Sequence, residues 1–376
     1  MIKMMSTLLL AWLLSGLPAA YAAPNLHFTT LRDVVDLSPP TSMIQDHQGF
    51  IWMASYTGLY RYDGYQSKHF KYRHNTPGSL PHDTVNSVFE DQLHRLWIGT
   101  LAGLALFEAE TGTFKTYFPL AEQGDAEQNR QIRKIVSDGG AGLWLATRQG
   151  LQHFDPGSGQ FRIYRHDPAQ PDSLASDNVD TLVLDPHGGL WLATWPGGLD
   201  YLPKGSSQFQ HFQTTDSDLP LAKNVRSLFI DSRQRLWMGT EAGIFIWQSG
   251  TAWADKKPLR IPGNLEHCKV HTFFEDSSGT IWAATICGLL RWDEIQQDFG
   301  SYQHQFEDPN SLAGNSVLSL LQDSSGSFWV GTTTGLSRVN LTLTGFEPVR
   351  LKPLSGTGSI LDNEVTAIAP AGLDRF

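Results

Sequence analysis

One seven-membered repeat constrains the fold of this chain more than any other feature. Seven segments share the pattern Asp, five residues, Trp, any residue, a small residue, Thr or Ser, two residues, Gly. The offset from Asp to Trp is six in every copy, and the tryptophans recur every 45 to 47 residues. The aspartates are Asp46, Asp91, Asp138, Asp185, Asp231, Asp276 and Asp323, and the tryptophans are Trp52, Trp97, Trp144, Trp191, Trp237, Trp282 and Trp329. A period of this length indicates a repeat architecture.

Each copy has the pattern of four short strands. In the second copy, near-alternating apolar and polar residues and intervening turns place strands over 85–90, 96–100, 104–108 and 114–117. One such sheet cannot bury both of its faces alone, so neighbouring copies must stack. The sequence therefore predicts an all-β fold, a seven-bladed β-propeller of four-stranded antiparallel blades, with the start of a truncated eighth repeat.

The periodic residues are predicted to be structural. Each Trp is expected to fill the gap between neighbouring blades, and each Asp is expected to accept backbone N–H groups in a tight turn. The small residue two positions after each Trp is expected where strands crowd toward the propeller axis. Because these positions repeat, function is expected where the copies differ.

The two ends of the chain are predicted to lie outside the propeller, which we assign to residues 23–355. Residues 1–22 have the features of a signal peptide: Lys3, an apolar run over 8–14, and a small-x-small cleavage pattern at residues 20–22. The alternative is an uncleaved anchor, although the apolar run is short for a membrane span. Residues 356–376 align with the beginning of the second repeat, so they are interpreted as the first strand of a truncated further repeat. The alternative is a natural end.

Two questions of pairing follow from the repeat. The last blade needs an outer strand, and both 26–31 and 346–349 offer one; the sequence leaves both open. Cys268 precedes the first strand of the sixth repeat, and Cys287 lies in its second turn. If the intervening hairpin turn is centred between Ser277 and Ser278, the two cysteines face each other within disulfide reach, so a disulfide is predicted. The alternative is two free thiols.

Composition and motifs exclude several functions. The formal net charge of −10 argues against a nucleic-acid partner. The chain has no Gly-x-Ser-x-Gly motif and no phosphate-binding glycine loop. His267, Cys268 and His271 are close in sequence, but their spacing matches no standard zinc pattern. We therefore predict no catalytic residue, no metal, no cofactor and no membrane span beyond the signal peptide.

Ligand-binding residues are expected on the turns between the second and third strands and on the links between blades, because propellers commonly bind ligands there. The candidates are Tyr56, Arg148, Trp195, Glu241 and His267. Trp195 and Arg148 are the first choices, since Trp195 is not at the repeated Trp position. Aromatic and hydrogen-bonding groups around a channel mouth suit a glycan or another polar small molecule.

Several motifs resemble the two-component regulator propeller family. They are Gly49-Phe50-Ile51-Trp52, Leu96-Trp97-Ile98-Gly99-Thr100, and the link Asn75-Thr76-Pro77-Gly78-Ser79-Leu80, which recurs in part as Asp308-Pro309-Asn310-Ser311-Leu312. The resemblance implies an exported, periplasmic, non-catalytic sensor region. It implies that the full-length protein is anchored in the inner membrane, is dimeric, and has a histidine kinase or diguanylate cyclase output. The alternatives are a secreted propeller enzyme acting on polysaccharide and an adaptor with a protein partner.

Overall fold

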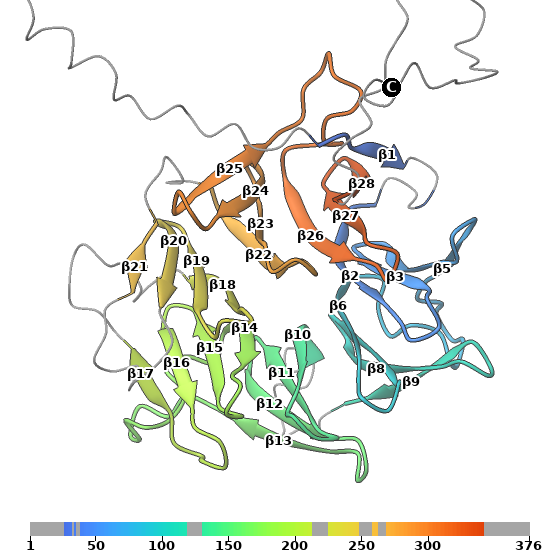
Figure 1. Cartoon of the computed structure of the whole chain (residues 1–376). Helices are drawn as coiled ribbons and strands as arrows, with labels where there is room; N and C mark the ends of the chain where they lie inside the picture. Colours follow the sequence, from blue (N-terminus) through green and yellow to red (C-terminus); the bar gives the residue numbers. More distant parts are fainter. Residues whose placement is uncertain are drawn as a thin grey trace, which may run out of the picture. The chain divides into compact units, whose positions relative to one another are not determined.

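A computed structural model describes residues 26–31, 34, 38–118, 130–212, 225–247, 258–261 and 268–341. Within these residues, strands form seven four-stranded antiparallel sheets arranged in a ring, which confirms the predicted seven-bladed propeller (Figure 1). The expected signal peptide over 1–22 and the truncated repeat over 356–376 lie outside the described residues. No helix in the described part of the chain has the length and apolarity that a membrane crossing requires.

The first six blades follow one order, from the strand at the centre to the strand at the rim. Blade one is β2 (Pro40–Gln45), β3 (Ile51–Ser55), β4 (Gly58–Tyr62) and β5 (Ser67–Phe70). Blade two is β6 (Val85–Glu90), β7 (Leu96–Thr100), β8 (Gly103–Glu108) and β9 (Thr113–Tyr117). Blade three is β10 (Ile132–Ser137), β11 (Leu143–Thr147), β12 (Gly150–Asp155) and β13 (Gln160–Tyr164).

The next three blades repeat this order. Blade four is β14 (Val179–Leu184), β15 (Leu190–Thr194), β16 (Gly198–Leu202) and β17 (Gln210–Phe212). Blade five is β18 (Val225–Ile230), β19 (Leu236–Thr240), β20 (Gly243–Trp247) and β21 (Leu259–Arg260). Blade six is β22 (Val270–Glu275), β23 (Ile281–Thr285), β24 (Gly288–Asp293) and β25 (Asp298–Tyr302).

The seventh blade joins the two ends of the propeller. It consists of β26 (Val317–Gln322), β27 (Ser327–Thr332), β28 (Gly335–Asn340) and, as its outer strand, β1 (Thr29–Leu31). Strand β1 pairs antiparallel with β28, with Thr29 opposite Arg338. Phe28, which precedes β1, is 2% exposed and packs edge-to-face on Tyr302 of blade six. The N-terminal strand therefore closes the ring, while the alternative over 346–349 lies outside the described residues.

The repeated Asp and Trp are bonded to each other in five blades. The Asp Oδ1 caps the hairpin turn by accepting backbone N–H groups, as predicted; in blade six Asp276 accepts those of Ser278 and Thr280 at 2.9 and 3.0 Å. The Oδ2 atom accepts the indole N–H of the Trp six residues later, at 2.7–2.8 Å. The five tryptophans are at most 2% exposed. The constant offset of six thus reflects one carboxylate that fixes both a turn and a buried ring.

Blades three and four replace this bond with another donor. His153 Nε2 lies 2.9 Å from Asp138 Oδ2, and Tyr201 donates its hydroxyl to Asp185 Oδ2 at 2.7 Å. Burial, and then the bond to Asp185, raise the pKa of Tyr201. Trp144 is only half-buried and contacts His153 with ring centroids 4.5 Å apart. In these two blades, too, the repeated Asp therefore accepts a hydrogen bond from a side chain.

Small residues after the tryptophans let consecutive blades approach closely. A Cβ atom on Gly99 would lie 2.7 Å from Cγ2 of Ile132, the first residue of the next inner strand. A Cβ on Gly331 would lie 2.6 Å from Cγ of Pro40, which begins β2 in blade one. These distances are too short for two carbon atoms that are not bonded to each other, so at these two positions only glycine fits without displacing the neighbouring blade.

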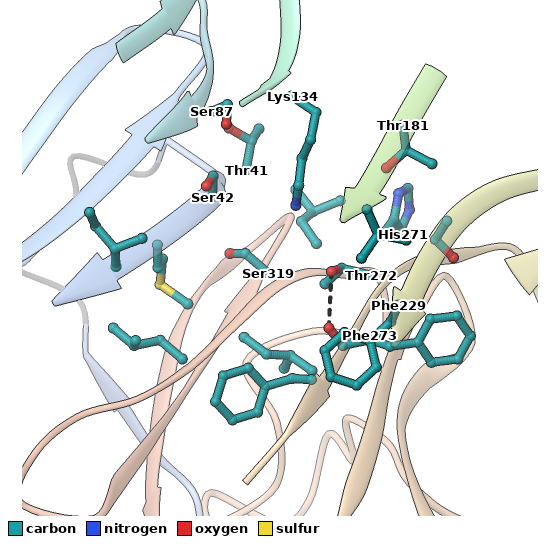
Figure 2. A pocket seen from close by; sticks show the side chains of 18 of the residues that line it. Thr41, Ser42, Ser87, Lys134, Thr181, Phe229, His271, Thr272, Phe273 and Ser319 are labelled. Atoms are coloured by element: carbon teal, nitrogen blue, oxygen red, sulfur yellow. Dashed lines mark hydrogen bonds between the residues drawn. The ribbon is translucent and has the colours of Figure 1, made fainter. Parts of the chain in front are cut away.

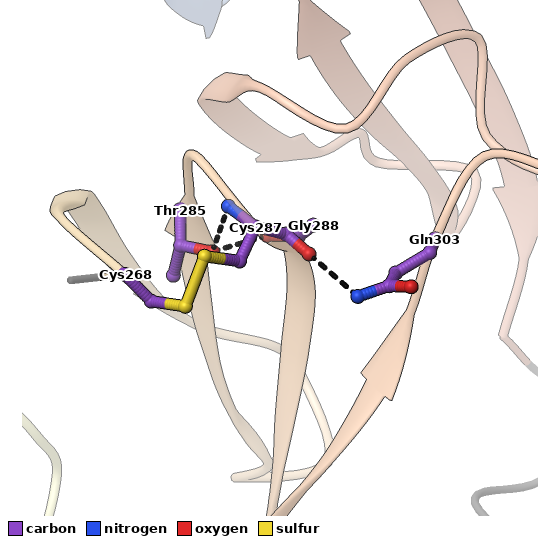
Figure 3. The surroundings of a disulfide bond; sticks show 5 residues. All are labelled: Cys268, Thr285, Cys287, Gly288 and Gln303. Carbon is purple, nitrogen blue, oxygen red and sulfur yellow. Dashed lines mark hydrogen bonds between the residues drawn. A yellow bond between two sulfur atoms is a disulfide. The ribbon is translucent and has the colours of Figure 1, made fainter. Parts of the chain in front are cut away.

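The two cysteines form a disulfide in blade six (Figure 3). Its S–S distance is 2.11 Å and its Cα–Cα distance is 5.4 Å. A register shift between Val270 and Thr272 makes Val270 the partner of Thr285. Two residues further out, that register places Cys268 opposite Cys287. The single extra residue in β22 is thus what aligns the two sulfur atoms.

Candidate ligand-binding site at the channel mouth

Every inner strand contains a β-bulge just after its first residue. This end of the strand lies next to the turn between the second and third strands of the same blade. A bulge turns one side chain out of the regular alternation. We call these seven positions the bulge ring. Its members are Thr41, Asn86, Arg133, Asp180, Arg226, His271 and Leu318. The repeated Trp is the same in every blade, whereas the residue in the bulge ring changes from blade to blade. Only blades three and five have the same residue there, an arginine.

The bulge ring lines the mouth of a central channel with a volume of about 980 Å³. Further along the inner strands the lining becomes more apolar and includes Phe229 and Phe273 (Figure 2). The channel therefore offers a polar mouth and an aromatic interior. A cavity of this size accommodates a ligand of several hundred daltons.

Charge at the mouth is concentrated over blades three to five. Arg133 Nη1 contacts Asp180 Oδ1, and Arg226 Nη1 donates to Asp180 Oδ2 at 2.8 Å. Arg226 Nη2 lies 3.3 Å from Glu241 Oε1. Burial lowers the pKa of Arg133, while the negative charge of Asp180 acts against this shift. One carboxylate thus bridges two arginines from the blades on either side of it.

Two neutral members of the bulge ring connect neighbouring blades. Thr41 Oγ1 donates to Val85 O at 3.0 Å, and Asn86 Nδ2 donates to Ile132 O at 2.8 Å. In blade six, burial lowers the pKa of His271 to about 4, and the charge of Lys269 adds to the effect. His271 is therefore a neutral imidazole near pH 7.

The next residue of each inner strand forms a second ring, in which one member differs from the others. Six blades have a hydroxyl there, and blade three has a lysine; the seven residues are Ser42, Ser87, Lys134, Thr181, Ser227, Thr272 and Ser319. Ser87 Oγ accepts the N–H of Ile135 in the next blade at 3.2 Å.

Lys134 extends instead into the open space between the inner strands (Figure 2). Solvent reaches it through the channel, but protein surrounds it, and this burial lowers its pKa. Its ammonium group has no hydrogen-bond or ion-pair partner among the described residues. The channel therefore contains an unpaired amine, and a negatively charged group bound beside it would favour its protonated form.

An outer ring is formed by the tips of the turns between the second and third strands, four residues after each repeated Trp. Its members are Tyr56, Leu101, Arg148, Trp195, Glu241, Ile286 and Thr333. These tips lie beside the starts of the inner strands; for example, the N–H of Trp195 donates to Asn178 O at 2.9 Å. The predicted ligand-binding residues on turns therefore surround the bulge ring.

The structure brings two of the predicted residues to the charged cluster formed by Arg133, Asp180 and Arg226. Glu241 bonds Arg226, and the charge of Arg148 acts on Arg133, lowering its pKa. Trp195 is 46% exposed on the turn of blade four, between the turns that carry Arg148 and Glu241. Tyr56 is 53% exposed but belongs to blade one, away from this cluster. His267 lies outside the described residues.

Sequence reasoning missed four residues of the site: Arg133, Lys134, Asp180 and Arg226. They lie on inner strands, which were interpreted as scaffold. Bulges are not visible in a local hydrophobic pattern, so nothing indicated that these side chains face the channel. A usable signal was present, however, because charged residues occupy positions that are neutral in the other copies.

Comparison with known proteins supports the repeat assignment. The sequence model described as two component regulator propeller matches residues 79–102 and 311–334. A search of curated proteins gave no match.

Similar solved structures share the propeller fold. The extracellular domain of BT3049, described as a hybrid two component system of B. thetaiotaomicron, is 23% identical with a TM-score of 0.71, covering 84% of this chain and 42% of that one. The extracellular domain of BT4673 from B. thetaiotaomicron is 20% identical with a TM-score of 0.68, covering 84% and 40%. Virginiamycin B lyase from Staphylococcus aureus is 12% identical with a TM-score of 0.62, covering 84% and 98%. The chain thus spans about two fifths of those two extracellular domains, and at these identities the likeness shows the fold alone.

Proposed function

We propose that this chain, a seven-bladed propeller carrying two component regulator propeller repeats, is the ligand-sensing region of a periplasmic, membrane-anchored signalling protein. The observation that carries the proposal is the match of two separate repeats to that family. In this proposal the propeller itself is non-catalytic. A histidine kinase or diguanylate cyclase output lies elsewhere in the full-length protein, which acts as a dimer.

The charged cluster at the mouth favours binding over catalysis. A polysaccharide hydrolase needs two carboxyl groups, one acting as an acid and the other as a base or nucleophile. Both Asp180 and Glu241 contact guanidinium groups. Both carboxyl groups are therefore engaged in fixing the arginines in place, rather than placed as a free acid–base pair.

The proposed ligand is a polar small molecule or glycan with an acidic group. Three arginines, Arg133, Arg148 and Arg226, face two carboxyl groups around the mouth, those of Asp180 and Glu241. Lys134 adds an amine that an acidic ligand would hold in its protonated form. This local excess stands out in a chain whose formal net charge is −10. Lys134 is the proposed contact for the acidic group, because its amine lies inside the channel without a partner among the described residues. Trp195 offers an exposed ring on which a sugar face can stack.

A thermal-shift experiment tests this ligand class. Uronic acid oligosaccharides and uncharged glucose oligosaccharides of matched length are compared, since a ligand that binds only the native state raises its melting temperature. We expect a shift with the acidic set only. Lys134→Ser, which restores the hydroxyl found in the other six blades, is expected to weaken binding at least about tenfold, as loss of one charge-assisted contact of about 1.5–3 kcal/mol implies.

Lys115→Ser is the matched control, because Lys115 is an exposed lysine on outer strand β9. Equal shifts for wild type and Lys134→Ser, or a shift with the uncharged set alone, would contradict the proposed ligand class. The signalling role is tested separately by the gene sequence downstream of Phe376. An in-frame membrane span and output domain are expected, and their absence would contradict the receptor assignment.

A further inference from the structure

Three side chains from two neighbouring blades meet at the end of the propeller opposite the channel mouth. His47 follows Asp46 in the β2–β3 turn, Glu90 is the last residue of β6, and His94 lies in the β6–β7 turn. Their potential ligand atoms all lie within 4.8 Å of one another. Within the described ranges, this is the one group of three or more His, Cys, Asp or Glu residues that meets this criterion.

The carboxylate is held in place between the histidines. Glu90 accepts the backbone N–H of His47 at 3.0 Å through Oε2, and its Oε1 lies 2.5 Å from His47 Nδ1 and 3.9 Å from His94 Nδ1. The two imidazole rings are 4.3 Å apart between centroids. The Glu90 side chain is only 15% exposed and has no Lys or Arg partner among the described residues.

Part of this arrangement recurs in other blades without histidine. The residue before the repeated Asp accepts the N–H of the residue after the preceding blade's Asp, as between Glu275 and Ser232 at 2.7 Å. This contact is therefore a general link between blades. The link between blades one and two differs, because a histidine is present in each of the two hairpin turns, His47 in blade one and His94 in blade two. One of them, His94, has φ 59°, at a position where blade six has Gly279. A left-handed backbone is uncommon for a residue with a side chain.

We propose that His47, Glu90 and His94 bind a divalent first-row transition ion such as Zn²⁺, with water completing the coordination. Two imidazoles and one carboxylate are a donor set that such ions accept. For ligand atoms about 2.0–2.1 Å from a tetrahedral ion, the separation between ligands is about 3.3 Å. The Glu90 Oε1 distances of 2.5 and 3.9 Å differ from this by less than 1 Å, so side-chain rotation suffices. The bound ion cross-links blades one and two.

Cobalt titration of the tag-free chain tests the site, with Zn²⁺ as competitor. Wild type is expected to bind one equivalent of Co²⁺, giving a visible absorption band that Zn²⁺ abolishes. His94→Gly is expected to weaken binding at least about tenfold, since loss of outer-shell partners alone costs 10–100-fold. This variant carries little folding risk, because glycine occupies the equivalent left-handed position in blade six.

The double variant His47→Ser with His94→Gly reproduces the Ser232, Glu275 and Gly279 arrangement of blades five and six, so it keeps the link between blades. It is expected to lose the absorption band. The control is His187→Ala, which removes an exposed histidine from the corresponding turn of blade four. Absence of a band in the wild type, or an unchanged band in the double variant, would overturn the proposal. Neither result bears on the ligand proposed for the channel mouth.

Discussion

Replacing Asp276 with Asn isolates the bond between the repeated Asp and Trp. Asn keeps the shape of Asp and can still accept the Ser278 and Thr280 N–H groups through one oxygen. Its amide nitrogen then faces the indole N–H of Trp282, which donates to Asp276 Oδ2 at 2.7 Å. Indole can only donate, so two donors meet in a site where Trp282 is 1% exposed.

The expected cost follows from the lost contact. A hydrogen bond to a charged group contributes about 1.5–3 kcal/mol, and a buried donor left without a partner costs about 1–3 kcal/mol. These contributions overlap, so Asp276→Asn should lower the free energy of unfolding by about 2–4 kcal/mol. The matched control is Asp138→Asn, because His153 can change tautomer and accept a hydrogen bond from the amide N–H. Its cost should be no more than about 1 kcal/mol, as for a partly exposed ion pair.

Urea unfolding followed by far-UV circular dichroism measures both values. A double-mutant cycle with Trp282→Phe adds a second check, since Asp276→Asn should cost little once the indole is gone. The expected coupling energy is about 1.5–3 kcal/mol. Equal losses for the two Asn variants, together with a coupling below about 0.5 kcal/mol, would refute the idea that the indole bond explains the fixed offset.

Three further outcomes are expected. Thiol titration of the denatured chain should find no free thiol, and replacing both Cys268 and Cys287 by Ser should lower the free energy of unfolding by about 2–4 kcal/mol; two free thiols would contradict the disulfide. Phe28→Ala should cost about 3–5 kcal/mol in urea unfolding, whereas the exposed Thr29→Ala should change stability by less than about 0.5 kcal/mol. Burial, aided by the charge of Lys269, lowers the pKa of His271 to about 4, so below about pH 6.5 the unfolded chain binds a proton that the folded chain does not. The free energy of unfolding should therefore fall as the pH decreases from about 6.5 toward 4. His271→Asn should weaken this pH dependence, which the midpoints of urea unfolding measure.

The sequence predicted those parts of the fold that repeat. A fixed offset between Asp46 and Trp52, recurring in every copy, reports the same hairpin seven times. The cysteine pairing was also accessible, because Cys268 and Cys287 flank one hairpin. The substitutes for the indole bond, His153 and Tyr201, were not accessible, since each occurs in one blade and contacts its aspartate from the third strand.

The candidate sites were predicted less completely than the fold. Arg148 and Glu241 were identified because turn tips are recognisable from glycine and spacing. Asp180 was not, because its orientation depends on a bulge. The His47, Glu90 and His94 cluster was missed because residues 43 apart meet only when two blades pack. Contacts between blades depend on the geometry of the closed ring, which no single repeat encodes.

The closure of blade seven has a consequence for how the chain is made. Strand β1 is synthesised first, yet its partner β28 lies about 300 residues later in the chain. At the usual rate of about 5–20 residues per second, β1 waits roughly 15–60 s before it can pair. Until β28 is made, β1 has no strand to pair with, and for most of that time Phe28 also lacks Tyr302, on which it packs in the folded chain. The last step of folding is therefore a long-range encounter, and the interval before it is when a chaperone has most to protect.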